Sequence, residues 1–213
     1  MASRNNDRRA RIEEMRRAEK ARERRGRIIT IAISGVVVAG LVGFGVYVLN
    51  KESEKKEQKV AEAKAPVTGE KTWDAKKLGR NHVTEAVKYP MKPPVGGDHN
   101  QAWMNCNGDV YKEPVAEMNA VHSLEHGAVW VTYNDKAPAA EVTKLTKRVK
   151  DTPYSLMSPV KDQTGVIMLS AWGKQLTVDS ADDPRVSQFF TKYVQGAQTP
   201  EPGAACTGGL AGK

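Results

Sequence analysis

The sequence predicts an α+β domain behind a single membrane-spanning helix. Residues 28–49 contain no formally charged side chain and are rich in Ile, Val, Leu and Gly. About 20 such residues in a helix cross the hydrocarbon core of a bilayer. Downstream, strand-like and helix-like patterns alternate between residues 73 and 196. We therefore expect an extracytoplasmic domain with a mostly antiparallel sheet packed by helices, and a ferredoxin-like half as its specific topology.

The charges on either side of residues 28–49 predict the orientation of this helix. Residues 1–27 carry eleven Lys or Arg and five Asp or Glu, whereas residues 50–64 carry five Lys and four Glu. The positive-inside rule therefore predicts a single-pass cell-membrane protein with a cytoplasmic N-terminus and an external C-terminal domain. A cleaved signal peptide is the alternative, but its apolar region would be only about 7 to 15 residues long.

The net charge of +8 does not predict nucleic-acid binding. Eleven basic and five acidic side chains in residues 1–27 account for six of these charges. A nucleic-acid-binding domain would spread its basic side chains over a folded face. We expect the basic tail to lie against the anionic headgroups of the lipid membrane instead.

Composition divides the chain into five parts. They are a basic cytoplasmic tail at 1–27, the transmembrane helix at 28–49, a charged stalk at 50–72, the α+β domain at 73–196 and an irregular tail at 197–213. The stalk has no aromatic residue and is interrupted by Pro66 and Gly69, which are typical of a linker.

One face of the transmembrane helix is formed by small residues. Gly35, Ala39 and Gly43 repeat every four residues, a spacing that lets two helices approach closely. This face predicts a helix-mediated homo-oligomer. The alternative is that glycine is simply frequent in membrane helices.

Helices are expected at three places in the domain. Residues 116–126 suit a short helix that ends at Gly127. Residues 138–150 begin with Pro138 and put Val142, Leu145 and Val149 on one face. Residues 184–194 have a similar apolar face, made of Val186, Phe189, Phe190, Tyr193 and Val194.

Strands are expected between and before these helices. Nearly every residue of the run A-V-W-V-T-Y at 128–133 has high strand propensity. Further strands are expected at 84–89, 154–160 and 166–172, and residues 91–107 are expected to form a loop. The residues K-D-Q-T-G at 161–165 predict a hairpin-like connection between the last two strands.

The chain has two cysteines, Cys106 and Cys206, and both lie on the expected outer side of the membrane. Oxidising compartments favour disulfide formation. We therefore expect a Cys106–Cys206 disulfide that joins the C-terminal tail to the domain, and two unpaired thiols are the alternative.

The strongest candidate for a metal site lies in H-S-L-E-H at 122–126. His122 and His126 share a face of one helical turn and can chelate one metal ion. His99 is the expected third ligand, because Gly96 and Gly97 allow its loop to approach closely. The alternative third ligands are Glu117, Glu125, Asp98 and Cys106. Zinc accepts all these donors, whereas copper would combine His with Met104, Met118 or Cys106.

The same segment does not predict an enzyme. H-S-L-E-H matches the H-x-x-E-H pattern of inverzincin metallopeptidases, but that pattern needs a longer helix and a distal ligand, and Gly127 follows at once. Ser123 adjoins His122 and does not face it on a helix. No enzyme class has a complete set of catalytic residues in this sequence.

Two functional classes remain. His122, Glu125 and His126 suit a buried hydrogen-bond network with Asp98 or Glu117 and with Trp103 and Trp130 as core aromatics. That hypothesis makes the chain a non-catalytic accessory or interaction protein of a membrane complex. The other hypothesis is a zinc- or copper-binding extracytoplasmic module, and the metal content of the protein distinguishes the two.

Four motifs in the C-terminal part resemble one known family. They are P-P-V-G-G-D-H at 93–99, W-M-N-C-N-G-D-V-Y at 103–111, the block at 114–133 that contains H-S-L-E-H, and P-E-P-G-A-A-C at 200–206. The chain resembles, over about 73–206, a bacterial membrane-protein family catalogued as domain of unknown function 3105. The resemblance implies a single-pass anchor and an extracytoplasmic domain, without an established activity.

Overall fold

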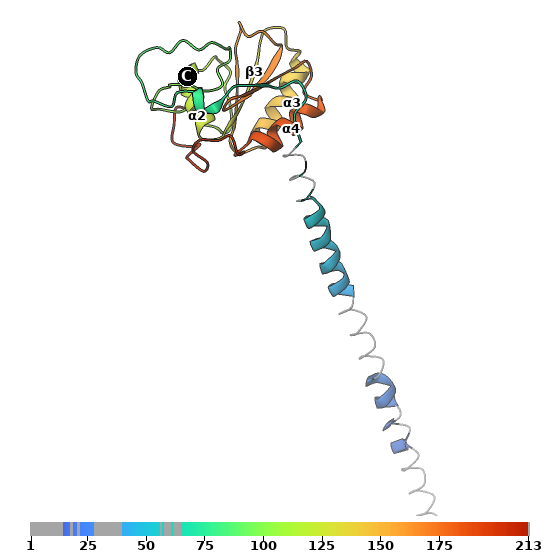
Figure 1. The fold of residues 1–213 in the computed structure, drawn as a ribbon. Coiled ribbons are helices and arrows are strands. Elements are labelled where there is room, and N and C mark those ends of the chain that lie inside the picture. Colours follow the sequence, from blue (N-terminus) through green and yellow to red (C-terminus); the bar gives the residue numbers. More distant parts are fainter. Residues whose placement is uncertain are drawn as a thin grey trace, which may run out of the picture. The chain divides into compact units, whose positions relative to one another are not determined.

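The computed structural model describes residues 15–17, 19–20, 22–27, 40–55, 57, 61 and 65–212 (Figure 1). The chain divides into two compact units, Met1–Gln58 and Lys59–Lys213. Each unit is described below by itself.

The described residues of the first unit are helical. Among the described residues, no helix is both long and apolar enough to cross a membrane. Residues 28–39 of the expected span 28–49 lie outside the described residues, and so do Gly35 and Ala39 of the expected helix-packing face. Most of the basic tail at 1–27 is also outside them.

In the described part of the second unit, six strands form one mixed sheet in the order β1-β6-β5-β3-β4-β2. The strands are β1 (Lys71–Thr72), β2 (Asn107–Val110), β3 (Val129–Tyr133), β4 (Ser155–Pro159), β5 (Ile167–Ala171) and β6 (Lys174–Val178). Strand β4 pairs in parallel with β2 and β3. The pairs β1–β6, β3–β5 and β5–β6 are antiparallel. The α+β class is therefore confirmed.

Helices cover both faces of this sheet. They are α2 (Glu117–Glu125), α3 (Ala139–Lys150) and α4 (Pro184–Tyr193), with a short 3₁₀ helix η1 (Ala75–Lys77) near the start. Figure 1 shows α2 on one side of β3, and α3 and α4 on the other. Side chains alternate between the faces of a strand, so Val129 and Val131 pack in one core with α3 and α4, whereas Trp130 packs in the other with α2.

The three expected helices are present, and local sequence explains their bounds. Helix α4 begins after Asp183, whose side chain accepts a hydrogen bond from Arg185 N at 2.9 Å, and Pro184 occupies its first turn. Helix α3 buries Leu145 and Val149, the predicted apolar positions. Helix α2 has seven buried residues among its nine, because both the sheet and the preceding loop cover it.

Three details of the predicted sheet are wrong. Residues 84–89 form no strand; Thr84, Glu85 and Ala86 are exposed and have no partner strand. The segments at 154–160 and 166–172 are strands, but β3 lies between them, so K-D-Q-T-G is not a hairpin turn. The hairpin is instead β5–β6, which turns at Gly173 with φ +68°. The predicted ferredoxin-like half is also wrong. The unit β3–α3–β4 has β3 and β4 as direct neighbours, whereas the two strands of the split βαβ unit in a ferredoxin-like fold are separated by another strand.

The packed unit includes parts of both flanking segments. Val67 is buried, and Lys71–Thr72 pairs with β6, although both lie within the expected stalk at 50–72. The C-terminal tail is irregular, as expected, but it is held against the loop before β2: Asn105 N donates to Leu210 O at 2.9 Å and Leu210 N to Trp103 O at 2.8 Å.

Candidate metal centre

Helix α2 supplies two polar side chains to the candidate site. His122 and Glu125 are three residues apart, so they lie on neighbouring positions of one helix face, and both are buried. The helix stops at Gly127, whose φ of +93° favours glycine. A Cβ atom at this position would also collide with Gln195 Nε2. The chain then continues directly into β3.

The loop before β2 brings His99 to the same place. Gly96 and Gly97 have φ values of +148° and +123°, and a Cβ on Gly96 would lie 2.9 Å from Leu78 Cδ1. Only a glycine lets the loop pass so close to the segment before it. His99 is fully buried as a result.

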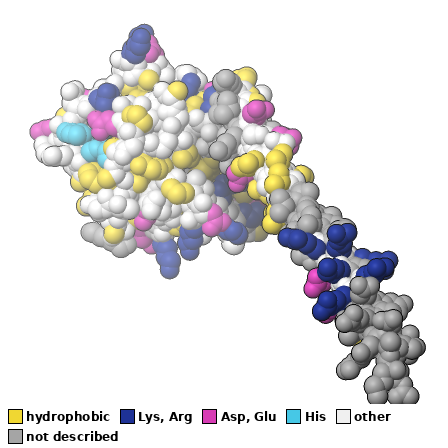
Figure 2. Space-filling model, turned by 90° about the horizontal axis from the view of Figure 1, so that it is seen from below, with side chains coloured by type: hydrophobic (Ala, Val, Ile, Leu, Met, Phe, Trp, Pro, Cys, Tyr) yellow, Lys and Arg dark blue, Asp and Glu magenta, His cyan; other side chains and the backbone are white. Residues whose placement is uncertain are grey.

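The segment at 79–83 adds a third histidine. His99 N donates to Asn81 O at 3.0 Å and Val83 N donates to His99 O at 2.8 Å, so His82 pairs with His99 as an isolated bridge. Asp98 holds the same segment, because its Oδ1 accepts from Asn81 N at 3.0 Å. His82 itself is exposed, and Figure 2 shows histidine side chains at the surface of this unit next to acidic ones.

Four side chains therefore converge: His82, His99, His122 and Glu125. Each offers one donor atom, and these atoms all lie within 4.8 Å of one another. The imidazole rings of His82 and His122 are stacked with centroids 4.7 Å apart, and that of His99 is 4.8 Å from His122. Donors on one tetrahedral zinc ion are about 3.3 Å apart, so small side-chain rotations would bring this set to coordinating distance.

The buried histidines of this set are held in one tautomer. His99 Nδ1 lies 2.8 Å from Gly97 O, and His122 Nδ1 lies 2.8 Å from Asn100 O. A carbonyl oxygen only accepts hydrogen bonds, so each Nδ1 must carry the proton. The Nε2 atom of each neutral ring then has a free lone pair. Histidines that bind metals are typically fixed in this way.

The Nε2 atom of His99 is the most informative atom of the cluster. It is buried, and among the described residues it has no hydrogen-bond partner. Its neighbour Glu125 Oε2 lies 3.0 Å away and forms an ion pair with the ring when His99 is protonated. Buried polar atoms without a partner are rare in folded proteins. When His99 is neutral, a metal cation between its Nε2 lone pair and the carboxylate would take the place of that proton.

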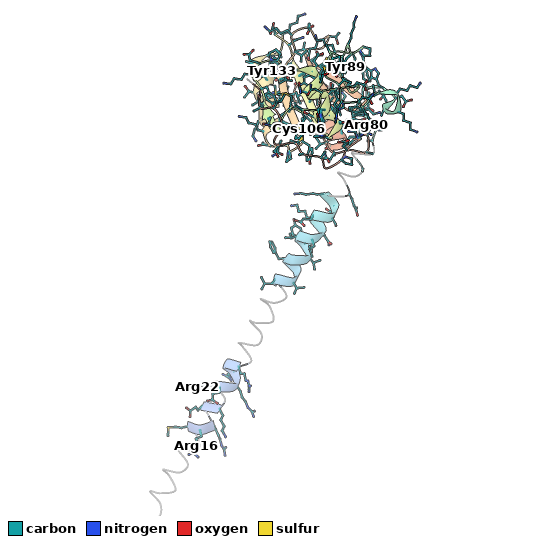
Figure 3. All side chains as sticks on the ribbon, turned by 90° about the vertical axis from the view of Figure 1, so that its left-hand side faces the viewer. Arg16, Arg22, Arg80, Tyr89, Cys106 and Tyr133 are labelled. Atoms are coloured by element: carbon teal, nitrogen blue, oxygen red, sulfur yellow. A yellow bond between two sulfur atoms is a disulfide. The ribbon has the colours of Figure 1, made fainter. Side chains whose placement is uncertain are left out.

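Glu125 remains ionised in this environment. Burial raises the pKa of its carboxyl group, but the nearby His99 and Arg80 outweigh this effect and lower the pKa to about 2. Arg80 Nε donates to Glu125 Oε1 at 2.6 Å, and Arg80 also reaches Glu201 Oε1 at 3.2 Å. Figure 3 labels Arg80 on the surface of the unit. The carboxylate is therefore available as an anionic ligand.

The pKa values of the two buried histidines are shifted in opposite directions. The pKa of His122 is lowered to about 4, chiefly by burial and also by the neighbouring His126, His99 and His82, against the opposing effect of the Asn100 carbonyl. Burial also lowers the pKa of His99, but the Glu125 carboxylate and the Gly97 carbonyl raise it above its usual value overall. His122 is thus a neutral imidazole near pH 7, the form that binds metals.

The other predicted site residues lie outside this group. His126 Nδ1 is 2.7 Å from Ala205 O, and its ring is 5.2 Å from that of Trp103. Glu117 Oε1 lies 3.6 Å from Lys92 Nζ. Cys106 is bonded to Cys206 and has no thiolate to offer. Of the expected triad, the structure therefore brings together His99 and His122, joined by Glu125 from the alternatives.

Sequence reasoning missed His82. No motif surrounds it, and it lies two residues before the strand expected at 84–89. Its one signal was its residue type, since it is one of only four histidines in the chain.

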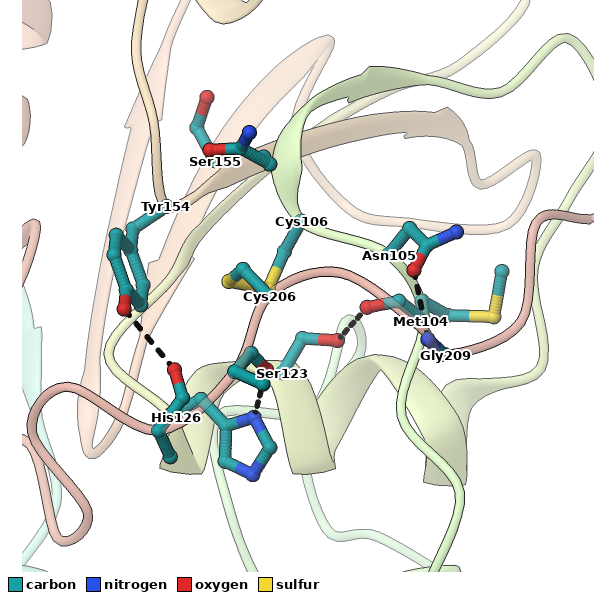
Figure 4. The surroundings of a disulfide bond; sticks show 12 residues. Met104, Asn105, Cys106, Ser123, His126, Tyr154, Ser155, Cys206 and Gly209 are labelled. Atoms are coloured by element: carbon teal, nitrogen blue, oxygen red, sulfur yellow. Dashed lines mark hydrogen bonds between the residues drawn. A yellow bond between two sulfur atoms is a disulfide. The ribbon is translucent and has the colours of Figure 1, made fainter.

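The expected disulfide is present between Cys106 and Cys206. Their Cα atoms lie 4.7 Å apart across a sequence separation of 100. Around the bond, Ser123 Oγ donates to Met104 O at 2.8 Å and Gly209 N donates to Asn105 Oδ1 at 2.9 Å (Figure 4). The disulfide therefore joins the C-terminal tail to the loop before β2, and Ser123 connects that loop to helix α2.

Comparison with known proteins gives one match. The model of a family described as "Protein of unknown function (DUF3105)" matches residues 82–208, a segment that contains all four converging side chains and both cysteines. No curated protein and no solved structure matches this chain. The chain belongs to the DUF3105 family of proteins of unknown function.

Proposed function

We propose that this protein is a membrane-anchored extracytoplasmic module that binds a divalent transition metal ion, with zinc as the first candidate. The ligands are His82, His99, His122 and Glu125. The observation that supports this most strongly is the buried Nε2 atom of His99, which has no hydrogen-bond partner among the described residues and faces a carboxylate.

The donor set favours zinc and copper(II). Three imidazoles and one carboxylate are borderline ligands that suit zinc, copper(II) and nickel, whereas calcium and magnesium prefer oxygen alone. The disulfide removes both thiolates, which are the donors that copper(I) prefers. Copper(II) is the second candidate, although such sites generally bind it more tightly than zinc.

The coordination number supports a non-catalytic role. Catalytic zinc sites use three protein ligands and keep one position open for water or substrate, whereas structural sites have four protein ligands. The described residues offer four candidate donors, which would fill a tetrahedral site. The module therefore stabilises a fold or holds a metal ion, and it serves as an accessory protein rather than as an enzyme.

The described end of the apolar segment supports membrane anchoring. Leu41, Phe44 and Leu49 are 68%, 67% and 67% exposed on the helix at 40–55, which is costly in water. Lys51 Nζ lies 3.4 Å from Tyr47 OH, and paired Tyr and Lys side chains are typical of the membrane–water interface. The strongly basic residues 1–27 favour a cytoplasmic N-terminus.

Metal analysis of the full-length chain, purified in mild detergent and dialysed against zinc, tests the proposal. We expect one zinc ion per chain in the wild type and less than about one tenth of that occupancy in His99→Asn and His122→Asn at limiting zinc. A wild-type chain that retains no zinc or copper would reject the metal site and favour the structural network.

A further inference from the structure

We infer that Arg80 and Glu201 are positioning residues for the metal ligand Glu125, and that the disulfide-closed C-terminal tail holds Glu201 in place. This inference rests on the proposed metal site. It goes further by assigning a role to two charged residues and to the disulfide, none of which is among the four proposed ligands.

Arg80 contacts one carboxylate oxygen of Glu125 and leaves the other facing His99. Its Nε atom donates to Glu125 Oε1 at 2.6 Å, while Glu125 Oε2 lies 3.0 Å from His99 Nε2. One oxygen is thus held by the guanidinium group, and the other is presented to the histidines. A carboxylate fixed in this way is a one-oxygen ligand with a defined direction.

Glu201 supports this arrangement through two contacts. Its side chain Oε1 accepts from Arg80 at 3.2 Å, which orients the guanidinium group. Its backbone N–H donates to Glu125 O at 3.0 Å, which places the tail directly on the end of α2. Groups that orient a metal ligand change the metal affinity about 10- to 100-fold when they are removed.

The tail around Glu201 is fixed at several points. Gly203 N donates to Gln195 Oε1 at 2.7 Å, and Tyr154 OH donates to Ala204 O at 3.1 Å. Cys206 is bonded to Cys106, whose N–H also donates to Cys206 O at 2.8 Å. The disulfide therefore limits how far Glu201 can move away from Arg80.

The dissociation constant for zinc and the visible absorption of bound Co²⁺ test this inference on the full-length chain. We expect Arg80→Gln and Glu201→Ala to weaken zinc binding about tenfold and to alter the Co²⁺ bands, because Glu125 loses its fixed direction. Glu201→Gln keeps an oxygen that accepts from Arg80, so it should restore near-wild-type values. Arg185→Gln, which breaks a similar arginine–carboxylate pair at α4, is the matched control and should change neither value.

The Cys106→Ser/Cys206→Ser variant tests the role of the tail. We expect zinc binding to weaken to a similar degree as in Glu201→Ala, with little further loss when the two changes are combined. Should the double-serine variant not fold, Glu201→Ala alone decides, since that side chain is 46% exposed. If the wild type binds zinc but Arg80→Gln and Glu201→Ala leave affinity and spectrum unchanged, this inference is wrong. If the wild type binds no metal, both it and the proposed function are wrong.

Discussion

Replacing His122 should make the free energy of unfolding of the metal-free protein fall less as the pH drops from 6.5 to 4.5. The pKa of His122 is lowered to about 4 in the folded chain, chiefly by burial, and is about 6.5 in an unfolded chain. Below pH 6.5 the unfolded state therefore binds a proton that the folded state does not bind until about pH 4. Folding stability must fall as the pH drops through this window.

The size of the effect follows from the pKa difference. Each pKa unit corresponds to about 1.4 kcal/mol, so His122 should cost the folded state about 2 kcal/mol between pH 6.5 and 4.5 and about 3 kcal/mol in total. The neighbouring His99 and Glu125 affect stability in other pH ranges. His99, with a raised pKa, contributes stability that is lost above pH 6.5. Glu125, with a pKa of about 2, contributes stability that is lost below about pH 4.5.

Urea unfolding in the presence of a chelator, at pH 6.5 and at pH 4.5, measures this difference. The wild type should lose about 2 kcal/mol more than His122→Asn between these two pH values. Equal losses in both proteins would show that His122 is not a buried neutral imidazole, and the tautomer argument for the site would then be wrong.

Three further outcomes are expected. Cys106→Ser/Cys206→Ser should lower the free energy of unfolding by at most about 4 to 5 kcal/mol in non-reducing urea titrations, because the disulfide closes a loop of 100 residues; an unchanged midpoint would contradict this. Gly127→Ala should lower it by about 1 to 3 kcal/mol, since φ is +93° and the new Cβ meets Gln195. Gly203→Ala, with φ +83° and no described heavy atom within 4 Å of its Cβ, is the control with strain but no collision and should cost less. In cell fractionation the chain should stay with the membranes after alkaline washing, whereas recovery in the soluble fraction would reject the anchor at 28–49.

The helices and the central strand were predictable because their signals are local. Helix α3 buries one face, at Leu145 and Val149, and the strand at 129–133 is buried on both faces. Such patterns can be recognised in a single sequence. Pairing is not local. The order that puts β3 between β4 and β5 depends on helix α3, which carries the chain across the sheet to a parallel neighbour. The short connection K-D-Q-T-G gives no indication that β3 lies between the two strands it links.

The candidate site was predictable in part for the same reason. His122 and Glu125 lie in one helical turn, and His99 lies in a glycine-rich loop that could approach them. His82 reaches the cluster only through backbone hydrogen bonds between Asn81, Val83 and His99, which no local pattern encodes. The i,i+4 spacing suggested His126, but His126 is not among the four described side chains whose donor atoms converge.

The comparison of His82→Ala with His126→Ala tests the proposed metal site most directly. His82 is exposed, so its removal should leave the circular dichroism spectrum unchanged while zinc affinity falls by about tenfold or more. His126→Ala should keep zinc affinity within about threefold of the wild type, because His126 is outside the converging group. Unchanged affinity in His82→Ala together with loss in His126→Ala would contradict the assignment of the four ligands.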